Sequence, residues 1–193
     1  MTLTPELIQR REDKKLPIEQ PRTLQQVSNM RFMDAYKDGE APQGRVEHGA
    51  MTREKDHGGD GTQQWEFMPV DKSMHYIIRQ VSSGLHLDAN CPEEDDAYVG
   101  VGAGDVETSK TGVKVGKAEP CATQVWKVEP VKILEGGDMV YRLFQESSNR
   151  VLDAFSDKRW AGGRDWQVVT RFEQGDDTQL WIIKPPVDTS HLE

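Results

Sequence analysis

A four-residue motif, Thr-Gln-x-Trp, occurs three times in this chain of 193 residues. Each copy is followed by a proline four residues after its tryptophan, and Trp65, Trp126 and Trp181 are 61 and then 55 residues apart. This spacing is the size of a small structural unit and too long for local low complexity. Because one unit of this size cannot bury its own apolar face, three related units are expected to close around a common core.

A second motif precedes each copy of the first and defines the unit. Residues 24–35 align without gaps with residues 78–89 and with residues 143–154. Gln, Ser, an apolar residue, Asp and Ala occupy the same columns in all three segments. From the Asp to the following Trp the units measure 31, 38 and 28 residues, and we expect these variable stretches to be surface loops.

The pattern inside each unit is typical of strands. No long segment has apolar residues at helical spacing. Apolar runs at 76–81 and 141–145 are followed by small or polar turn residues and then by short runs at 85–87 and 150–152, which predicts hairpins. Further strands are predicted at 113–115, 126–128, 167–170 and 181–184. The chain is therefore predicted to be all-β.

The domain organisation follows from the repeat. Residues 1–22 lie outside it and are predicted to form an N-terminal arm, residues 23–186 a single domain, and residues 187–193 a tail. The repeats are placed at about 23–70, 75–131 and 140–186.

The charge and the cysteine content of the chain limit the partners and the cellular location to be expected. The net charge of −9 and the pI near 5.1 argue against nucleic acid or an anionic membrane surface as the partner. No apolar run approaches the roughly 18 residues of a spanning helix, and the first residues lack the pattern of a secretory signal. The chain has two cysteines and no Asn-x-Ser/Thr acceptor, so we predict a cytoplasmic location, with secretion by a non-classical route or as a mature form as the alternative. Cys91 and Cys121 flank the middle insertion. They are expected either to form one disulfide bridge that closes it or to be two free thiols.

These residues resemble the ricin-type β-trefoil lectins, whose mark is one Gln-x-Trp motif in each repeat. The resemblance covers about residues 23–186 and is greatest to cytoplasmic fungal and bacterial members, which lack the plant disulfides. It implies a six-stranded barrel capped by three hairpins with a pseudo-threefold axis. The three tryptophans would lie in the core, and Gln63, Gln124 and Gln179 would bond nearby backbone or the aspartate of their repeat in preference to a ligand.

The resemblance also implies sugar-binding positions. A lectin aspartate shortly after the second strand of a repeat accepts two hydroxyl hydrogen bonds, and Asp34, Asp88 and Asp153 are predicted to occupy that position. Each aspartate could instead hold a turn with no ligand bound. The polar residue and the glutamine of the motif add contacts, which places Thr62, Gln63, Thr178 and Gln179 in the candidate sites.

The resemblance also implies an aromatic ring that stacks on the sugar, and here the chain matches the family less regularly. Counting back from Trp181 puts the platform at Arg171 with Phe172 beside it, and in the first unit the count gives Lys55 with His57 nearby. The middle unit offers no ring. The third site is therefore ranked first, the first site second, and the middle site as lost. Tyr36 and Phe155 could be stacking surfaces or core residues.

The predicted function is a non-catalytic lectin for neutral glycans of the galactose or N-acetylgalactosamine type, with several sites or a homodimer supplying avidity. No nucleophile, base and orienting residue form a catalytic set, and no His or Cys has metal-ligand spacing, so no enzyme activity, cofactor or metal is predicted. The alternative is a trefoil that binds protein, such as a protease inhibitor or defence protein, through the 90–120 loop.

Overall fold

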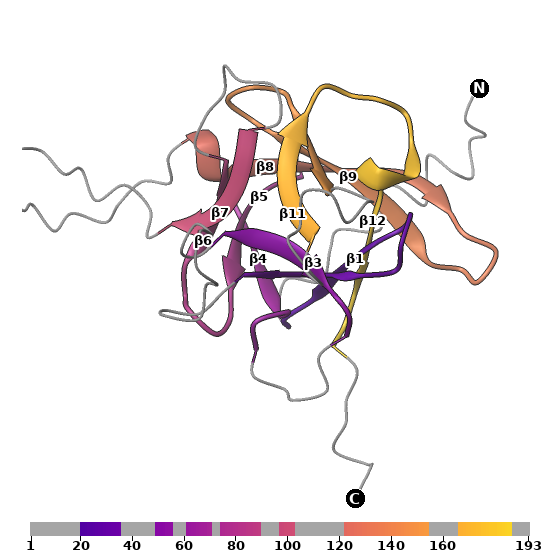
Figure 1. Cartoon of the computed structure of the whole chain (residues 1–193), viewed down its shortest axis with the longest axis horizontal. Coiled ribbons are helices and arrows are strands. Elements are labelled where there is room, and N and C mark those ends of the chain that lie inside the picture. The colour runs from indigo at the N-terminus through magenta and orange to yellow at the C-terminus, as the bar shows by residue number, and fades with distance from the viewer. Residues whose placement is uncertain are drawn as a thin grey trace, which may run out of the picture.

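The computed structural model describes residues 20–35, 49–55, 61–70, 74–89, 97–102, 122–154 and 166–186. Within these ranges it has twelve strands, two short 3-10 helices and no α-helix (Figure 1). The elements are β1 (Thr23–Gln26), β2 (Phe32–Ala35), β3 (Ala50–Arg53), β4 (Trp65–Pro69), β5 (His75–Gln80), β6 (His86–Ala89), β7 (Ala97–Gly102), η1 (Ala122–Gln124), β8 (Val125–Ile133), β9 (Met139–Gln145), β10 (Val151–Ala154), β11 (Trp166–Arg171), η2 (Asp177–Gln179) and β12 (Trp181–Lys184).

The strands predicted from the sequence are present wherever the structure describes them. The runs at 76–81 and 141–145 correspond to β5 and β9, and those at 126–128, 167–170 and 181–184 to β8, β11 and β12. The strand predicted at 113–115, the tail, both cysteines and most of the predicted arm and of the 90–120 loop fall outside the described residues.

Six of the strands form a closed barrel. Its neighbours are antiparallel in the order β1, β12, β9, β8, β5 and β4. The ring closes where Arg22 and Trp65 exchange backbone hydrogen bonds of 2.7 and 2.8 Å. The other six strands form the hairpins β2–β3, β6–β7 and β10–β11, and β11 also pairs with β3 and β7. This is the β-trefoil that the resemblance implied.

The three repeated tryptophans lie at the centre of this fold, as predicted. Trp65, Trp126 and Trp181 are each 0% exposed and pack in one cluster with apolar residues from all three units. A buried indole N–H needs an acceptor. Each one donates to the backbone carbonyl just before the aspartate of its own unit, with lengths of 2.9 to 3.1 Å to Met33, Leu87 and Leu152.

A second set of buried side chains joins each unit to the preceding one. The glutamine that ends the first strand of each unit donates through Nε2 to two backbone carbonyls of its neighbour. Gln80 bonds Ala35 and Thr62, Gln145 bonds Ala89 and Thr123, and Gln26 bonds Ala154 and Thr178, with lengths of 2.6 to 3.0 Å. The bonds run cyclically from unit to unit, which explains why this glutamine recurs in the sequence.

The turn after each of these glutamines needs a left-handed residue. Gly84 and Asn149 occupy that position with φ of 71° and 54°, and Met30 occupies it in the first unit with φ of 59°. Glycine adopts this conformation freely and Asn is tolerated, whereas Met carries a steric cost. The Met30 side chain is also exposed, so it gains little from burial.

Met30→Gly is therefore expected to raise the free energy of unfolding by about 0.5–1 kcal/mol, measured by urea denaturation. Gly84→Ala is the matched control. An added Cβ there meets no atom within 4 Å, so any loss of stability comes from the backbone conformation alone. Destabilisation by Met30→Gly would show that the Met side chain contributes more than its φ costs.

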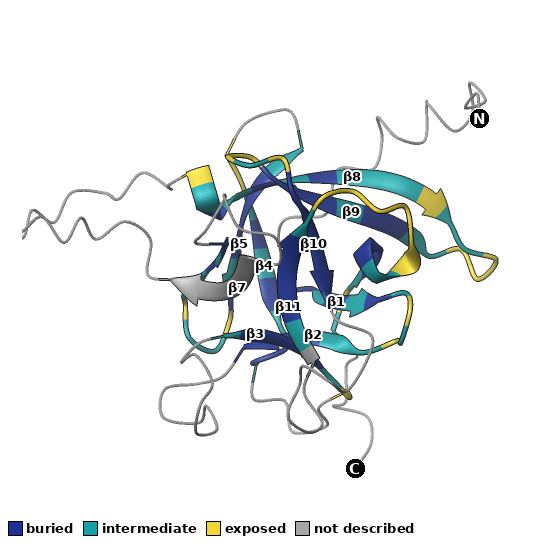
Figure 2. Cartoon of the chain, turned by 45° about the horizontal axis from the view of Figure 1, so that its top comes forward, coloured by how far each residue is buried: buried dark blue, intermediate teal, exposed yellow. Residues whose placement is uncertain are grey.

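One hairpin differs from its counterparts. The strands β8 and β9 are nine and seven residues long, against five and six for β4 and β5, and a bulge lies between Pro130 and Lys132. The outer end of the hairpin projects from the barrel (Figure 2). Between the bulge and the turn, Val131 and Leu134 pack on a small second cluster formed by Val140, Leu180 and Ile182.

Candidate ligand-binding site

The aspartates of all three units lie within a strand and not after it, which corrects the position expected from the sequence. Asp34 is in β2 and Asp153 in β10, and both are buried. Asp88 is in β6 and half-buried. A buried carboxylate needs donors close by. The arrangement therefore gives these aspartates a place in the internal hydrogen-bond network of each unit.

The glutamines of the Thr-Gln-x-Trp motif are those donors, as predicted. The Nε2 atoms of Gln63, Gln124 and Gln179 lie 3.3, 3.1 and 3.3 Å from the Oδ2 atoms of Asp34, Asp88 and Asp153. Gln63 and Gln179 also donate to backbone carbonyls, at 2.9 Å to Glu54 and 2.8 Å to Phe172. Gln63 and Gln179 thus tie the second strand of their units to the segment that leads into the motif.

An arginine pairs with the aspartate in two of the three units. Arg53 Nη1 is 3.5 Å from Asp34 Oδ2, and Arg171 Nη1 is 3.8 Å from Asp153 Oδ2. The strand register makes the two arginines equivalent, because each lies two residues beyond the partner of its aspartate, Met51 in β3 or Val169 in β11.

This register corrects the alignment counted back from the tryptophans, which placed Lys55 opposite Arg171. The stretch from arginine to tryptophan is 12 residues in the first unit and 10 in the third, so a gap-free count goes wrong by two. The residue equivalent to Phe172 is Glu54. His57, Tyr36 and Phe155 lie outside the described residues.

A second arginine supports the same two units and was missed in the sequence. Arg31 Nη2 and Arg150 Nη2 each donate at 2.9 Å to a backbone carbonyl, that of Thr52 in β3 and that of Thr170 in β11. The gap-free alignment already placed Arg31 over Arg150, so this signal was available. The middle unit has Leu85 and Gly102 at the two arginine positions. The middle unit therefore lacks both of the arginines that accompany the aspartate in the first and third units.

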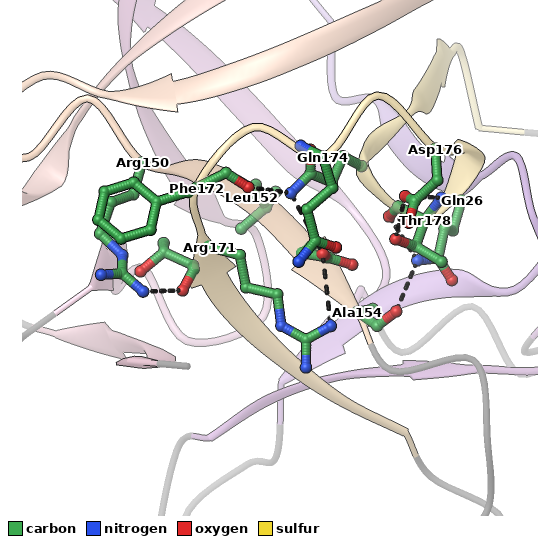
Figure 3. A network of polar contacts seen from close by, with 12 residues as sticks. Gln26, Arg150, Leu152, Ala154, Arg171, Phe172, Gln174, Asp176 and Thr178 are labelled. Atoms are coloured by element: carbon green, nitrogen blue, oxygen red, sulfur yellow. Dashed lines mark hydrogen bonds and ion pairs between the residues drawn. The ribbon is translucent and has the colours of Figure 1, made fainter. Parts of the chain in front are cut away.

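The third unit adds an exposed ring. Phe172 is 67% exposed, and Arg150 Cζ lies 4.9 Å from the centroid of the ring, within cation–π range. Figure 3 shows Phe172 beside Arg150, with Arg171 and Gln174 close by and Asp176 and Thr178 further along the same loop. The Thr178 hydroxyl donates to Asp176 Oδ1 at 2.5 Å. Thr62, its first-unit equivalent, is buried.

Burial raises the pKa of the Asp153 carboxyl above its usual range. The neighbouring Thr178 and Gln179 side chains and the charge of Arg171 lower this pKa, and the nearby charge of Asp176 raises it, but desolvation is the largest effect. The ionised carboxylate is therefore less favourable in the folded chain than in water.

This pKa predicts how stability depends on pH. The folded-state pKa lies above the unfolded value, so the native chain binds the proton more tightly and the cost of the charge is relieved as the pH falls through the folded pKa towards 3.8. The free energy of unfolding of the wild type should rise relative to that of Asp153→Asn as the pH is lowered from 7 to 4. Urea denaturation at a series of pH values measures this difference. A fall over the same range would mean that Arg171 outweighs burial.

Among the described residues, no group of three or more His, Cys, Asp or Glu side chains could hold a metal ion. No helix in the described part of the chain is long and apolar enough to cross a membrane.

No protein-family model matches the chain, and no curated protein matches its sequence. Solved structures do resemble it. The Macrolepiota procera ricin B-like lectin, in complex with lactose, has a TM-score of 0.61 at 18% identity over 90% of this chain and 100% of the lectin. The Rhizoctonia solani agglutinin has the same score and identity over 89% and 98%. The designed threefold-symmetric protein ThreeFoil gives 0.57 and 18% over 85% and 97%. These likenesses establish the β-trefoil fold.

Proposed function

We propose that the chain is a non-catalytic carbohydrate-binding protein with its principal site in the third unit and a second site in the first. The observation that carries the proposal is the exposed Phe172 ring, which follows the end of β11 and lies beside Arg150. A large ring with this exposure gains nothing from the core, whereas it can cover the apolar face of a sugar. Exposed aromatic rings with a few fixed polar groups are typical of ligand sites.

The polar groups near the ring suit hydroxyl ligands. The Arg171 guanidinium is partly exposed and offers several donors, and the Thr178 and Asp176 oxygens can accept or exchange hydrogen bonds. Asp153 and Gln179 are buried, so we assign them the task of holding Arg171 and the Phe172 backbone. In the first unit Asp34, Arg53 and Gln63 repeat this support, with Glu54 in place of the ring.

The ligand class is inferred from the neighbours and from the chemistry of the site. Two of the neighbours are a lectin and an agglutinin, and the lectin is in complex with lactose. We therefore propose neutral glycans of the galactose type, bound weakly at each site and more tightly when two sites are engaged. The middle unit, which lacks both arginines, is proposed to contribute no site. The low cysteine content and the absence of an Asn-x-Ser/Thr acceptor favour a cytoplasmic protein.

A glycan array with the purified chain tests this proposal, followed by a lactose titration monitored by amide NMR shifts. Binding should perturb the amides around Phe172 and Thr178 most, those around Arg53 less, and those of β6 not at all. A folded protein that binds no glycan on the array would overturn the proposal. Binding of a protein target with no effect of sugar would favour the alternative of a protein-binding trefoil.

A further inference from the structure

The long β8–β9 hairpin reaches the loop that carries the candidate site. Arg142 of β9 donates through Nη1 to Glu173 Oε1, and Lys132 Nζ lies 3.2 Å from Asp177 Oδ1. Both acceptors belong to residues 172–178, the segment between β11 and the motif glutamine Gln179, which we call the site loop. Two cations of the hairpin therefore hold two carboxylates of the site loop.

The two contacts differ in strength. The side chain of Arg142 is 15% exposed, so its ion pair with Glu173 is shielded from solvent on one side. Both side chains of the Lys132–Asp177 pair are about half exposed, and such pairs contribute little on their own. The Arg142–Glu173 ion pair is thus the stronger of the two contacts between the hairpin and the site loop.

The site loop is also held from inside. Gln179 donates through Nε2 to the Phe172 carbonyl and accepts through Oε1 from the Gln174 amide, both at 2.8 Å. Glu173 lies between Phe172 and Gln174, the two residues that Gln179 binds. Arg142 therefore binds the site loop from the hairpin side at the same place where Gln179 binds it from the protein interior. The position of the Phe172 ring depends on this segment.

This outer contact belongs to the third unit alone among the described residues. The residues aligned with Arg142 are Thr23 in the first unit and the buried Ile77 in the second, and neither side chain carries a charge. The repeat therefore does not explain Arg142. Its contact with Glu173 does.

We propose that Arg142, assisted by Lys132, is a positioning residue that holds the site loop in its binding conformation. The extended hairpin would then act as a brace that orders Phe172 before a ligand arrives, which reduces the entropy lost on binding. The ligand part rests on the proposed function, whereas the ordering of the loop does not. The effect on ligand binding and the ordering of the loop can therefore be tested separately, by one measurement each.

The first measurement is hydrogen exchange of the free protein. In Arg142→Gln the Gln174 amide should exchange about fivefold faster than in the wild type, because the loop opens more often, while the amides of β9 and β12 stay protected. Lys184→Gln is the matched control, since it breaks the ion pair between Lys184 Nζ of β12 and Asp138 Oδ2 in the turn of the same hairpin without touching the site loop. Unchanged exchange at Gln174, or an equal increase in both variants, would overturn the proposal.

The second measurement is lactose binding followed separately at the two sites by NMR. Arg142→Gln should weaken binding at Phe172 about fivefold and leave the shifts around Arg53 unchanged. The charge swap Arg142→Glu with Glu173→Arg should restore most of both the protection and the binding. If the wild type binds no lactose, the proposed function is wrong. The hydrogen-exchange data still show whether Arg142 orders the site loop. If lactose binds equally well to Arg142→Gln, the proposed effect of the brace on binding is wrong and the lectin function stands.

Discussion

Trp181→Ala is expected to lower the free energy of unfolding by about 3–5 kcal/mol. The indole is fully buried in the central cluster, and its Nε1 donates at 3.0 Å to the Leu152 carbonyl. Alanine would leave a cavity shared by all three units and a buried carbonyl without its donor. Because small domains are stable by only about 5–15 kcal/mol, this one change should remove a large part of the total. Urea denaturation followed by circular dichroism measures it.

Trp181→Phe separates the two causes. Phenylalanine fills most of the space but cannot donate to Leu152, so its loss should be nearer 1–2 kcal/mol. The same pair of substitutions at Trp126, which donates to the Leu87 carbonyl at 2.9 Å, should behave alike because the site is related by the repeat. A loss below about 1 kcal/mol for Trp181→Ala would contradict the packed core described above.

Phe172→Ala is expected to weaken lactose binding at the third site by a factor of about ten or more, the range of an aromatic contact residue. Its effect on the free energy of unfolding should stay within about 0.5 kcal/mol, because the ring is mostly exposed and touches chiefly Arg150. Amide NMR titration with lactose measures the affinity, and urea denaturation measures the stability.

The first unit provides the matched test. Glu54 occupies the position equivalent to Phe172 and its side chain is largely exposed, so Glu54→Ala should change lactose binding at the third site by less than a factor of two. Glu54→Phe installs the missing ring beside Arg31 and should strengthen binding at the first site. If Phe172→Ala leaves lactose affinity unchanged at normal stability, the ring has no part in recognition.

The fold was predictable because the repeat has a physical cause that acts locally. Each Thr-Gln-x-Trp copy places an indole in the core and an amide on a neighbouring aspartate, as Trp126, Gln124 and Asp88 show. Any chain that closes three such units must keep these residues at similar spacing. The periodicity of the sequence therefore reports the architecture directly.

The candidate site was less predictable because it depends on register and on contacts that do not repeat. A two-residue difference in loop length hid the equivalence of Arg53 and Arg171, which strand pairing reveals. The sequence indicated the aspartates as ligand contacts, yet Asp153 is buried and paired, so Asp153→Ala should cost stability. The contact between Arg142 and Glu173 has no counterpart in another unit.

The pairing of the first strand with the last has a consequence for the topology of the chain. Thr23 of β1 lies opposite Lys184 of β12, so the two ends of the trefoil meet side by side in the barrel wall. The glutamine contacts likewise run from the third unit back to the first without a break. In three dimensions the molecule is a ring of units in which none comes first. A circular permutant opened at Gly136-Gly137, with the two ends joined by a short linker, would keep every barrel pairing.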